Sequence, residues 1–530
     1  MGRLPMVIAL SLFPLPGLIA GEMTPKPDGR LLSEVTVPES PEQVQLRRRV
    51  ALLQRLVRVP PRDNEGVNRV KQILDAIRNE EMDLAERLLA QVEAAYTSLE
   101  TQTAGDIFHF LLANVAAMDG ERKRQQQEFA IAANLLRKAL SLLPPWAVKE
   151  RAARLVSLGK VLRQGGKFSE AGKALDEAQH LVEKHLPPDH TLVADTLDAQ
   201  GVLLVDLERL HEAEPLLQRA LAMREKQWGS VHILTARSLA HLGRLRELQR
   251  RFSDAEQLQQ RALQIRLGQL EPNNPEIAQN LHDLGVLRLA QDRFAEAEPL
   301  LRQALAMRKE TLEPSYLDVA ASLQALAMIE RKEGKPDQAA AALQQALGMC
   351  RQRGGADYPL TGIILHSLGA LYLEKRSLVE AEKYLRQALL FTERVYGPEH
   401  TRMNNIIDPL AELYQIQERN QEAEALLRKS LSVAEHKLGH HHHQVANRHV
   451  RLGHHYQSVG NFTEAEHHFR QGLEIERDIA PAGGQGIQWL RDYAILLRDM
   501  GRPAFAQMID SLADSLRAGK RFTIPVLSNR

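Results

Sequence analysis

Histidine is the residue type whose clustering in this sequence could do chemistry. Ten of the 20 histidines fall between His436 and His468, and they include the run His440, His441, His442 and His443. Neutral imidazole binds zinc, copper or nickel, and it gains a proton at about pH 6.5. The run therefore predicts a transition-metal site or a charge that responds to acid. A solvated polar loop is the alternative interpretation, because no spaced carboxylate or thiolate ligands accompany the histidines.

Motifs for catalysis are missing from the sequence. It contains no glycine-rich phosphate loop, no Cys-x-x-Cys pair, no His-Glu-x-x-His helix and no nucleophile elbow. The single cysteine, Cys350, lies in an apolar-flanked stretch, which predicts a packed thiol rather than a nucleophile, and it cannot form an internal disulfide. We therefore expect no enzyme activity and no cofactor.

A repeat of 42 residues organises most of the chain. Its eight units open at Phe168, Leu210, Phe252, Phe294, Pro336, Leu378, Asn420 and Phe462, and an alanine follows each opening residue by three positions. Twelve residues before each alanine stands a small residue, in the column Gly159, Gly201, Gly243, Gly285, Ala327, Gly369, Ala411 and Gly453. Such a column predicts that two elements approach each other closely in every unit.

Each unit is predicted to be a pair of helices. Apolar residues recur at helical spacing before the opening residue, as at Leu281 and Leu284, and again after it, as at Leu301 and Ala304. Glycine or polar residues stand at the break between the two halves, as a chain reversal after a helix requires.

The repeat resembles the tetratricopeptide repeat. The segments Glu-Ala-Glu-Pro-Leu-Leu-Gln-Arg-Ala-Leu (212–221) and Tyr-Gly-Pro-Glu-His-Thr (396–401), with a period of 42, are similar to the kinesin-light-chain type of that family. This resemblance implies an all-α fold, a right-handed superhelical solenoid of antiparallel helix pairs, with about eleven pairs and degenerate ends. It also implies a concave groove that binds peptides or partner proteins, and it does not imply a motor complex.

The chain divides into six predicted segments. They are a signal peptide (1–20), a proline-rich linker (21–41), irregular helical repeats (42–149), eight regular repeats (150–480), a capping helix pair (481–518) and a flexible tail (519–530).

Residues 1–20 predict export. Arg3 precedes the apolar stretch 6–13, which is too short to span a bilayer, and Ala20 precedes a polar sequence. We expect a periplasmic or extracellular protein. The alternative is translation from Met23 and a cytoplasmic location.

The predicted binding groove is lined by the first helix of each unit. In the family that the chain resembles, outward residues lie at fixed offsets around the small column, and those offsets give polar residues of mixed charge. They are Lys160, Arg163, Asp195, Asp198, Arg237, Arg244, Gln279, His282, Gln324, Arg331, His366, Asn405, Asp408, Asn447, His454 and Gln457. Polar residues are also the rule on exposed helix faces.

Charge and composition limit the partners. The 68 basic and 67 acidic residues nearly cancel, which argues against general nucleic-acid binding. We predict a non-catalytic scaffold that binds a partner protein or an extended peptide and has no membrane span. The alternatives are an accessory protein of an envelope complex with a His-rich metal or pH response, and a peptide-sensing regulator. The sequence leaves the oligomeric state open.

Overall fold

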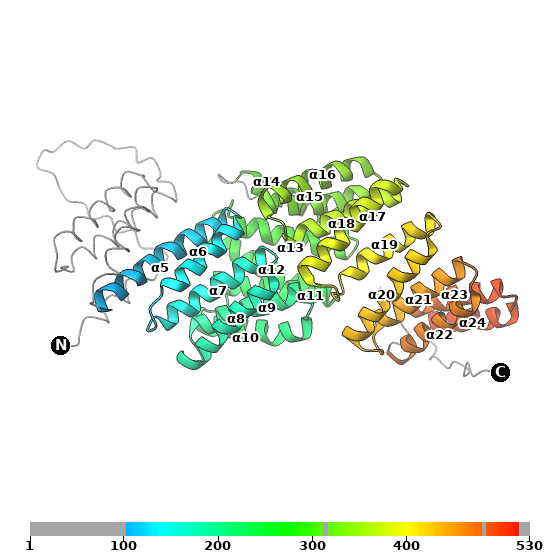
Figure 1. Ribbon diagram of the computed structural model, residues 1–530, viewed down its shortest axis with the longest axis horizontal. Helices are drawn as coiled ribbons and strands as arrows, with labels where there is room; N and C mark the ends of the chain where they lie inside the picture. Colours follow the sequence, from blue (N-terminus) through cyan, green and yellow to red (C-terminus); the bar gives the residue numbers. More distant parts are fainter. Residues whose placement is uncertain (1–101, 311–315, 480–483, 519–530) are drawn as a thin grey trace, which may run out of the picture. The chain divides into compact units, whose positions relative to one another are not determined.

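The computed structural model describes residues 102–310, 316–479 and 484–518, which form twenty α-helices and no strand. The helices follow one another as ten antiparallel pairs (Figure 1). The predicted all-α solenoid of helix pairs is thereby confirmed. The predicted signal peptide (1–20), linker (21–41) and tail (519–530) lie outside the described residues, as does the first part of the irregular segment.

The first helices of the ten pairs form one series. They are α5 (Gln102–Gln125), α7 (Val148–Gln164), α9 (Thr191–Asp206), α11 (Ile233–Leu248), α13 (Pro275–Ala290), α15 (Tyr316–Lys332), α17 (Pro359–Glu374), α19 (Met403–Ile416), α21 (His443–Ser458) and α23 (Gly484–Asp499).

The second helices form the other series, and eight of them begin at the opening residues of the repeat. They are α6 (Phe129–Leu142), α8 (Phe168–His185), α10 (Leu210–Trp228), α12 (Phe252–Gln269), α14 (Phe294–Glu310), α16 (Pro336–Met349), α18 (Leu378–Tyr396), α20 (Asn420–Leu438), α22 (Phe462–Ile479) and α24 (Pro503–Arg517). After α16 the chain forms a π-helical turn, Cys350–Gly354, before the next unit begins.

The small column marks the place where the two helices of a pair touch. A Cβ atom built on Gly201 or Gly285 would lie 2.6 Å from the Cγ atom of Leu217 or Leu301, closer than real Cβ contacts come. The alanines of the repeat, such as Ala213 and Ala297, are fully buried beside these contacts. The predicted close approach of the helices is confirmed, and it explains why a larger residue is absent from the column.

The first helices form the inner wall of the curved array. Each first helix from α7 to α17 contacts the first helix of the next unit, whereas successive second helices do not come equally close. A stack of helix pairs must curve toward the side on which its members lie closer together. The residues that the first helices direct away from their own pairs therefore line the concave side, which we call the inner wall.

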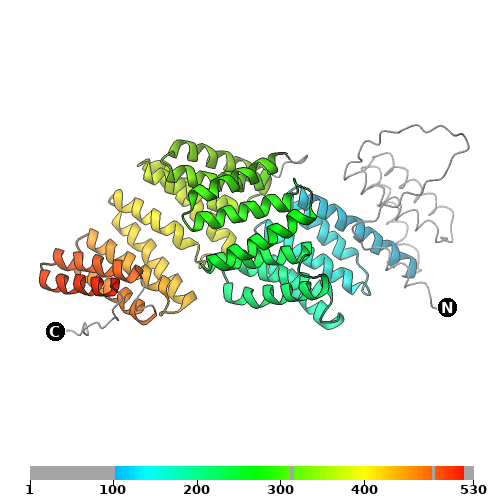
Figure 2. The same ribbon diagram turned by 180° about the vertical axis from the view of Figure 1, so that it is seen from behind.

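The array also meets itself after about 190 residues. The turns that join α5 to α6, α7 to α8 and α9 to α10 contact the segments at the starts of α15, α17 and α19. Figures 1 and 2 show the α5–α6 turn beside the start of α15 from opposite sides. We call this line of contacts the seam.

The helix α19 departs from the regular pattern. It contains Pro409 and has 14 residues, whereas most other first helices of the regular units have 16 or 17. Proline lacks the amide hydrogen that an internal helical bond needs, and its ring crowds the preceding turn. The sequence predicts a shortened or kinked helix here, and the helix is short.

None of the helices in the described ranges is long and apolar enough to cross a membrane.

Candidate functional site

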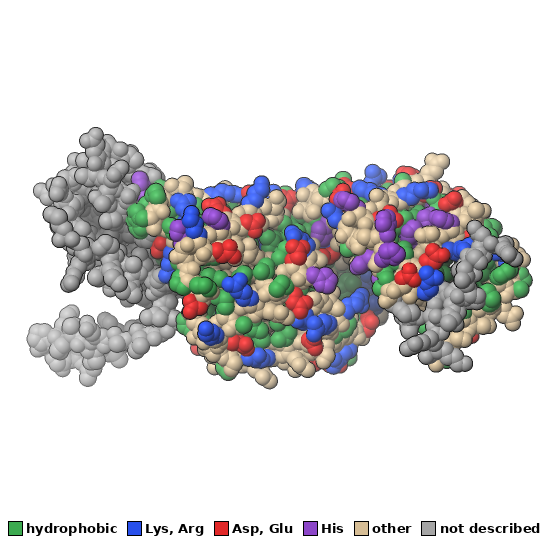
Figure 3. All heavy atoms as spheres, turned by 90° about the horizontal axis from the view of Figure 1, so that it is seen from below, with side chains coloured by type: hydrophobic (Ala, Val, Ile, Leu, Met, Phe, Trp, Pro, Cys, Tyr) green, Lys and Arg blue, Asp and Glu red, His purple; other side chains and the backbone are tan. Residues whose placement is uncertain are grey.

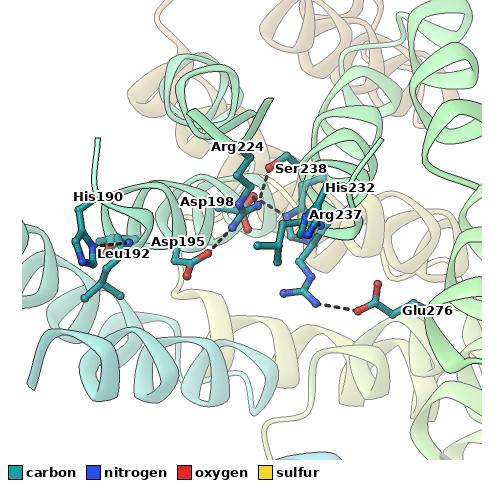
Figure 4. Close-up of polar contacts among 12 residues, drawn as sticks. His190, Leu192, Asp195, Asp198, Arg224, His232, Arg237, Ser238 and Glu276 are labelled. Atoms are coloured by element: carbon teal, nitrogen blue, oxygen red, sulfur yellow. Dashed lines mark hydrogen bonds and ion pairs between the residues drawn. The ribbon is translucent and has the colours of Figure 1, made fainter. Parts of the chain in front are cut away.

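The inner wall carries the residues that the sequence predicted as the groove, but many of them bond within the protein. Asp195 of α9 accepts a hydrogen bond from Nη2 of Arg224 at 2.7 Å. Asp198, one turn further on, lies 3.3 Å from Nη1 of Arg224 and 2.9 Å from Nδ1 of His241. Figure 4 shows Arg224 reaching from α10 between α9 and α11 to make these contacts. The two aspartates are thus held by the fold.

The electrostatics of Asp198 agree with this structural role. Its side chain is 1% exposed, and burial by itself would raise the pKa of the carboxyl. The neighbouring His241 and Arg224 outweigh that effect and hold the pKa of Asp198 well below its usual range. Asp198 therefore stays ionised at neutral pH and pairs with Arg224.

Arg224 belongs to a column of buried arginines that the sequence analysis missed. Arg224, Arg266 and Arg308 are spaced by 42 residues and are each at most 5% exposed. Each donates to a polar residue fourteen positions later, in the next first helix, at 2.6 to 2.9 Å. These acceptors are Ser238, Asn280 and Ser322. The column is visible in the sequence, because other units have Val182, Cys350 or Thr392 at this position.

Other predicted groove residues link successive first helices to each other. The ion pairs and hydrogen bonds are Arg163 with Asp206, Arg237 with Glu276, Arg331 with Glu374, Asp408 with Arg448, His454 with Asp492 and Gln457 with Asp499. Gln279 accepts from Arg308 and donates to Asp283, each at 2.7 Å. The contacts of Gln279 stay within its own helix pair, whereas the other six contacts cross the boundary between units and hold neighbouring first helices in register.

A smaller set of predicted residues lies on the wall without such an ion pair. Lys160 on α7 is half-buried, and Arg244 on α11 is exposed. Burial lowers the pKa of Lys160, although Asp195 and Asp198 partly oppose this effect. Gln324, His366, Asn405 and Asn447 are also half-buried or exposed on their first helices. These residues have surface that a ligand could contact.

The centre of the wall carries titratable groups around Arg244. Burial raises the pKa of Glu247 to about 7, with a smaller opposing effect of Arg244 and a further rise from Asp283. Burial also raises the pKa of Asp283 and lowers that of His282 well below its usual range. His282 has a buried Nδ1 atom without a hydrogen-bond partner among the residues that the structure describes. At neutral pH the wall therefore contains a partly protonated glutamate, a neutral histidine and a charged arginine.

The repeat position of Lys160 and Arg244 is apolar in several other units. Val202, Val286 and Met328 occupy it and are half-buried, whereas Ala370, Glu412 and His454 occupy it in the last three regular units. On α17, the apolar Ile363 is 43% exposed. The wall of α7 to α15 thus offers both cationic and apolar positions.

Two histidines of the run make contacts within the protein. His442 accepts a hydrogen bond from the amide of Gln444 at 3.1 Å through Nδ1, and it caps α21. His443 pairs through Nδ1 with Glu476 at 2.6 Å and stacks on Trp489. No group of three histidine, cysteine or acidic residues among the described residues is placed to hold a metal ion. Metal binding by His440, His441, His442 and His443 stays a prediction.

Histidines cap helices elsewhere in the array as well. His190, His232 and His400 stand at the position of His442 in their own units, and each accepts from the amide two residues later at 3.1 to 3.2 Å. Figure 4 shows this contact between His190 and Leu192. Asn274 does the same in α13, with its side-chain oxygen. His190 and His232 thus cap α9 and α11, a role usually taken by Ser, Thr, Asp or Asn, whereas His400 binds the amide of Arg402 just before α19 begins.

The remaining histidines of the cluster are partly in the core. His449 and His468 are each 8% exposed, and their Nδ1 atoms lie 3.0 Å apart between α21 and α22. Figure 3 shows histidine side chains gathered on one face over the C-terminal part of the described residues.

The cysteine Cys350 is fully buried, and burial raises the pKa of its thiol to about 12. The predicted packed thiol is confirmed.

Comparison with known proteins points to one family. The family model described as a tetratricopeptide repeat matches residues 150–226, 201–268, 234–310, 318–393 and 401–478. A second model with the same description matches residues 282–353. No curated protein matches the chain.

Solved structures are similar to parts of this chain. The BtubC (BKLC) protein from P. vanneervenii is 20% identical, with a TM-score of 0.38, over 44% of this chain and 91% of its own. A putative kinesin light chain from Podosopora anserina with nearly identical TPR-like repeats is 24% identical, with a TM-score of 0.35, over 39% of this chain and 98% of its own. A Rap protein complexed with Competence and Sporulation Factor is 15% identical, with a TM-score of 0.48, over 70% of this chain and 98% of its own.

Proposed function

Because this chain belongs to the tetratricopeptide repeat family, we propose that it is a non-catalytic scaffold that binds an extended segment of a partner protein. The segment lies along the inner wall of α7, α9, α11, α13, α15 and α17. It carries acidic and apolar side chains that meet the cationic and apolar positions of the wall.

The observation that carries the proposal is that Lys160 and Arg244 lack ion-pair partners among the described residues. Most charged residues of the wall are engaged in contacts between helices, whereas neither of these two cations forms an ion pair with another of the described residues. They share one repeat position, and Val202 lies between them at the same position of the intervening unit. A carboxylate of a bound segment would form charge-assisted hydrogen bonds to either cation. Burial of apolar ligand side chains on Val202, Val286 and Ile363 would supply the non-specific part of the affinity.

The test is affinity capture from an extract of the source organism, with identification of bound proteins by mass spectrometry. The variant Lys160→Ala, Arg244→Ala should lose a partner that the native chain captures. The matched control is Lys173→Ala, Arg302→Ala, which removes the same two residue types from exposed positions on the second helices α8 and α14. Equal capture by both variants would show that the partner does not use this part of the wall.

Export remains a separate prediction. We propose that residues 1–20 are removed and that the protein leaves the cytoplasm, on the basis of the sequence pattern described above. Intact-mass measurement of the protein recovered from fractionated cells tests this, and an unprocessed cytoplasmic chain would contradict it.

A further inference from the structure

The seam joins two parts of the array that are about 190 residues apart in the sequence. In the first contact, Gln127 donates from Nε2 to Asp318 at 3.1 Å and accepts from the amide of Leu317 at 2.7 Å. In the third contact, Glu208 accepts from Oγ1 of Thr401 at 2.6 Å and from Nε of Arg402 at 3.0 Å. Three successive units are therefore attached to three others.

The middle contact of the seam is the closest. Lys167 forms an ion pair with Asp357, and Phe168 stacks on Tyr396 with ring centroids 5.1 Å apart. The backbone itself touches at Gly166, where an added Cβ atom would lie 1.9 Å from the carbonyl oxygen of Asp357. Only glycine leaves room for this approach.

Gly166 differs in this respect from its equivalents in other units. Gly334 and Gly460 occupy the same turn and also have positive φ angles, but an added Cβ atom would meet nothing within 4 Å at either residue. Their glycines serve the left-handed backbone conformation alone. At Gly166 the missing side chain also permits contact between two distant parts of the chain.

The seam limits the routes by which a partner can reach the inner wall. Along an open superhelix, a partner could enter sideways between successive turns. Here polar contacts bridge that gap at three consecutive units, and the inner wall is the concave side of the turn that they join. The wall nevertheless keeps solvent-exposed side chains, such as Arg244 and Ile363, so the turn is not filled by its own residues.

We propose that the seam makes the inner wall accessible to an extended, unfolded peptide segment and closes it to folded domains. This inference rests on the proposed function for the identity of the ligand as a protein segment. The proposed function states that a protein segment binds the wall, whereas this inference adds that folded domains cannot reach it. The inference can be tested without knowing the partner.

The test measures how fast a cysteine on the wall reacts with maleimides of two shapes. Gln324→Cys places a thiol on the inner wall at α15, and Gln303→Cys places one at an exposed position of α14. One reagent is a maleimide on an unstructured peptide, and the other is a maleimide on a short linker to a folded domain. The native Cys350 does not compete, because it is fully buried and its thiol has a raised pKa.

The expected result is a difference between the two sites in the full chain. At Gln303→Cys both reagents should react at similar rates. At Gln324→Cys the folded reagent should react at least about tenfold more slowly than the peptide reagent, because few orientations bring its maleimide to the thiol. Similar rates of the two reagents at Gln324→Cys would overturn the proposal.

A second substitution shows whether the seam causes the exclusion. Gly166→Ala forces the backbone at Asp357 away and should restore the reaction of the folded reagent at Gln324→Cys. Gly334→Ala imposes the same strain of a positive φ without touching the seam, and it should restore nothing. Continued exclusion in the Gly166→Ala variant, or equal restoration by Gly334→Ala, would show that the seam does not close the wall.

A charge-reversal variant tests the seam independently, in case Gly166→Ala does not fold. Lys167→Glu together with Glu208→Lys puts like charges against Asp357 and Arg402 without a change in backbone preference. Circular dichroism would confirm that helix content is retained. This variant should also admit the folded reagent, and its failure to do so would count against the proposal.

Discussion

Acid should destabilise the C-terminal part of the array through the buried pair His449 and His468. The Nδ1 atoms of the two rings lie 3.0 Å apart, so one ring donates and the other accepts, and the contact cannot persist when both rings are protonated. Burial, together with the positive charge of neighbouring histidines, lowers the pKa of each ring to about 4; the main such neighbour is His468 for His449 and His467 for His468. Glu435 lies 3.9 Å from Nε2 of His449, and Tyr456 stacks on His468.

The sign of the pH effect follows from these values. A histidine in the unfolded chain has a pKa of about 6.5, so the unfolded state binds protons that the folded state does not bind between about pH 6.5 and pH 4. The free energy of unfolding should be constant above this window and should fall as the pH falls through it. Between about pH 7.5 and pH 5 the loss is about 2 kcal/mol for each ring, or about 4 kcal/mol for the pair.

The assay is urea unfolding followed by the fluorescence of Trp489, at a series of pH values between about 7.5 and 4.5. Trp489 is buried in α23, the helix that follows α22, and therefore reports on this region. Trp146 and Trp228 are exposed and are replaced by phenylalanine to leave one signal. The double variant His449→Phe, His468→Phe should remove about 4 kcal/mol of the acid-induced loss, because neither ring can then bind a proton.

The control keeps the number of histidines equal. His180→Gln together with His441→Gln removes two exposed rings, and the acid-induced loss of stability should remain as in the native chain. Other buried histidines contribute to the native pH dependence, so the comparison between the two double variants carries the test. If both variants lose the same stability at about pH 5, the buried pair does not cause the acid sensitivity.

Three further predictions concern the repeat itself. His232→Ala should lower the free energy of unfolding by about 1 kcal/mol, and His232→Asn should restore it, since asparagine also accepts the cap bond; urea titration measures both. Gly285→Ala should cost about 1 to 3 kcal/mol because the new methyl group meets Leu301, whereas Gly268→Ala, where nothing lies within 4 Å, should not; equal melting temperatures of the two variants would contradict the close-contact account. Arg224→Met should cost about 3 to 5 kcal/mol because it leaves Asp198 buried without its cation, and adding Asp198→Leu should recover most of that loss; calorimetry of the single and double variants decides whether the pair is coupled.

The repeat pattern was sufficient to predict the fold. A period of 42 residues with apolar spacing of three and four specifies helix pairs, and the starts of the second helices fall at the residues that open the units. The column of small residues predicts the close contact within each pair, because a side chain larger than alanine does not fit between two touching helices. These features are local, because each depends only on the residues of one repeat unit.

The candidate site was predicted less completely. The helix offsets place Lys160 and Arg244 on the inner wall, but they do not show that Arg237 and Arg331 are engaged by Glu276 and Glu374 of the next unit. The buried arginines at 224, 266 and 308 could have been found, because they share one repeat position. The role of the histidines could not, since a run of imidazoles looks the same whether its nitrogens cap a helix or face a metal ion.

The seam could be decided only by the tertiary structure. The separation of about 190 residues between its two sides is not specified by the residues of any single repeat unit. It depends on the small rotation and translation from each helix pair to the next, which accumulate over several units before Gly166 meets Asp357. The sequence alone determined the repeating helix pair and its packing surface. The superhelical path of the whole array determined which distant edges touch and which wall residues lie on the concave side of the turn that they join.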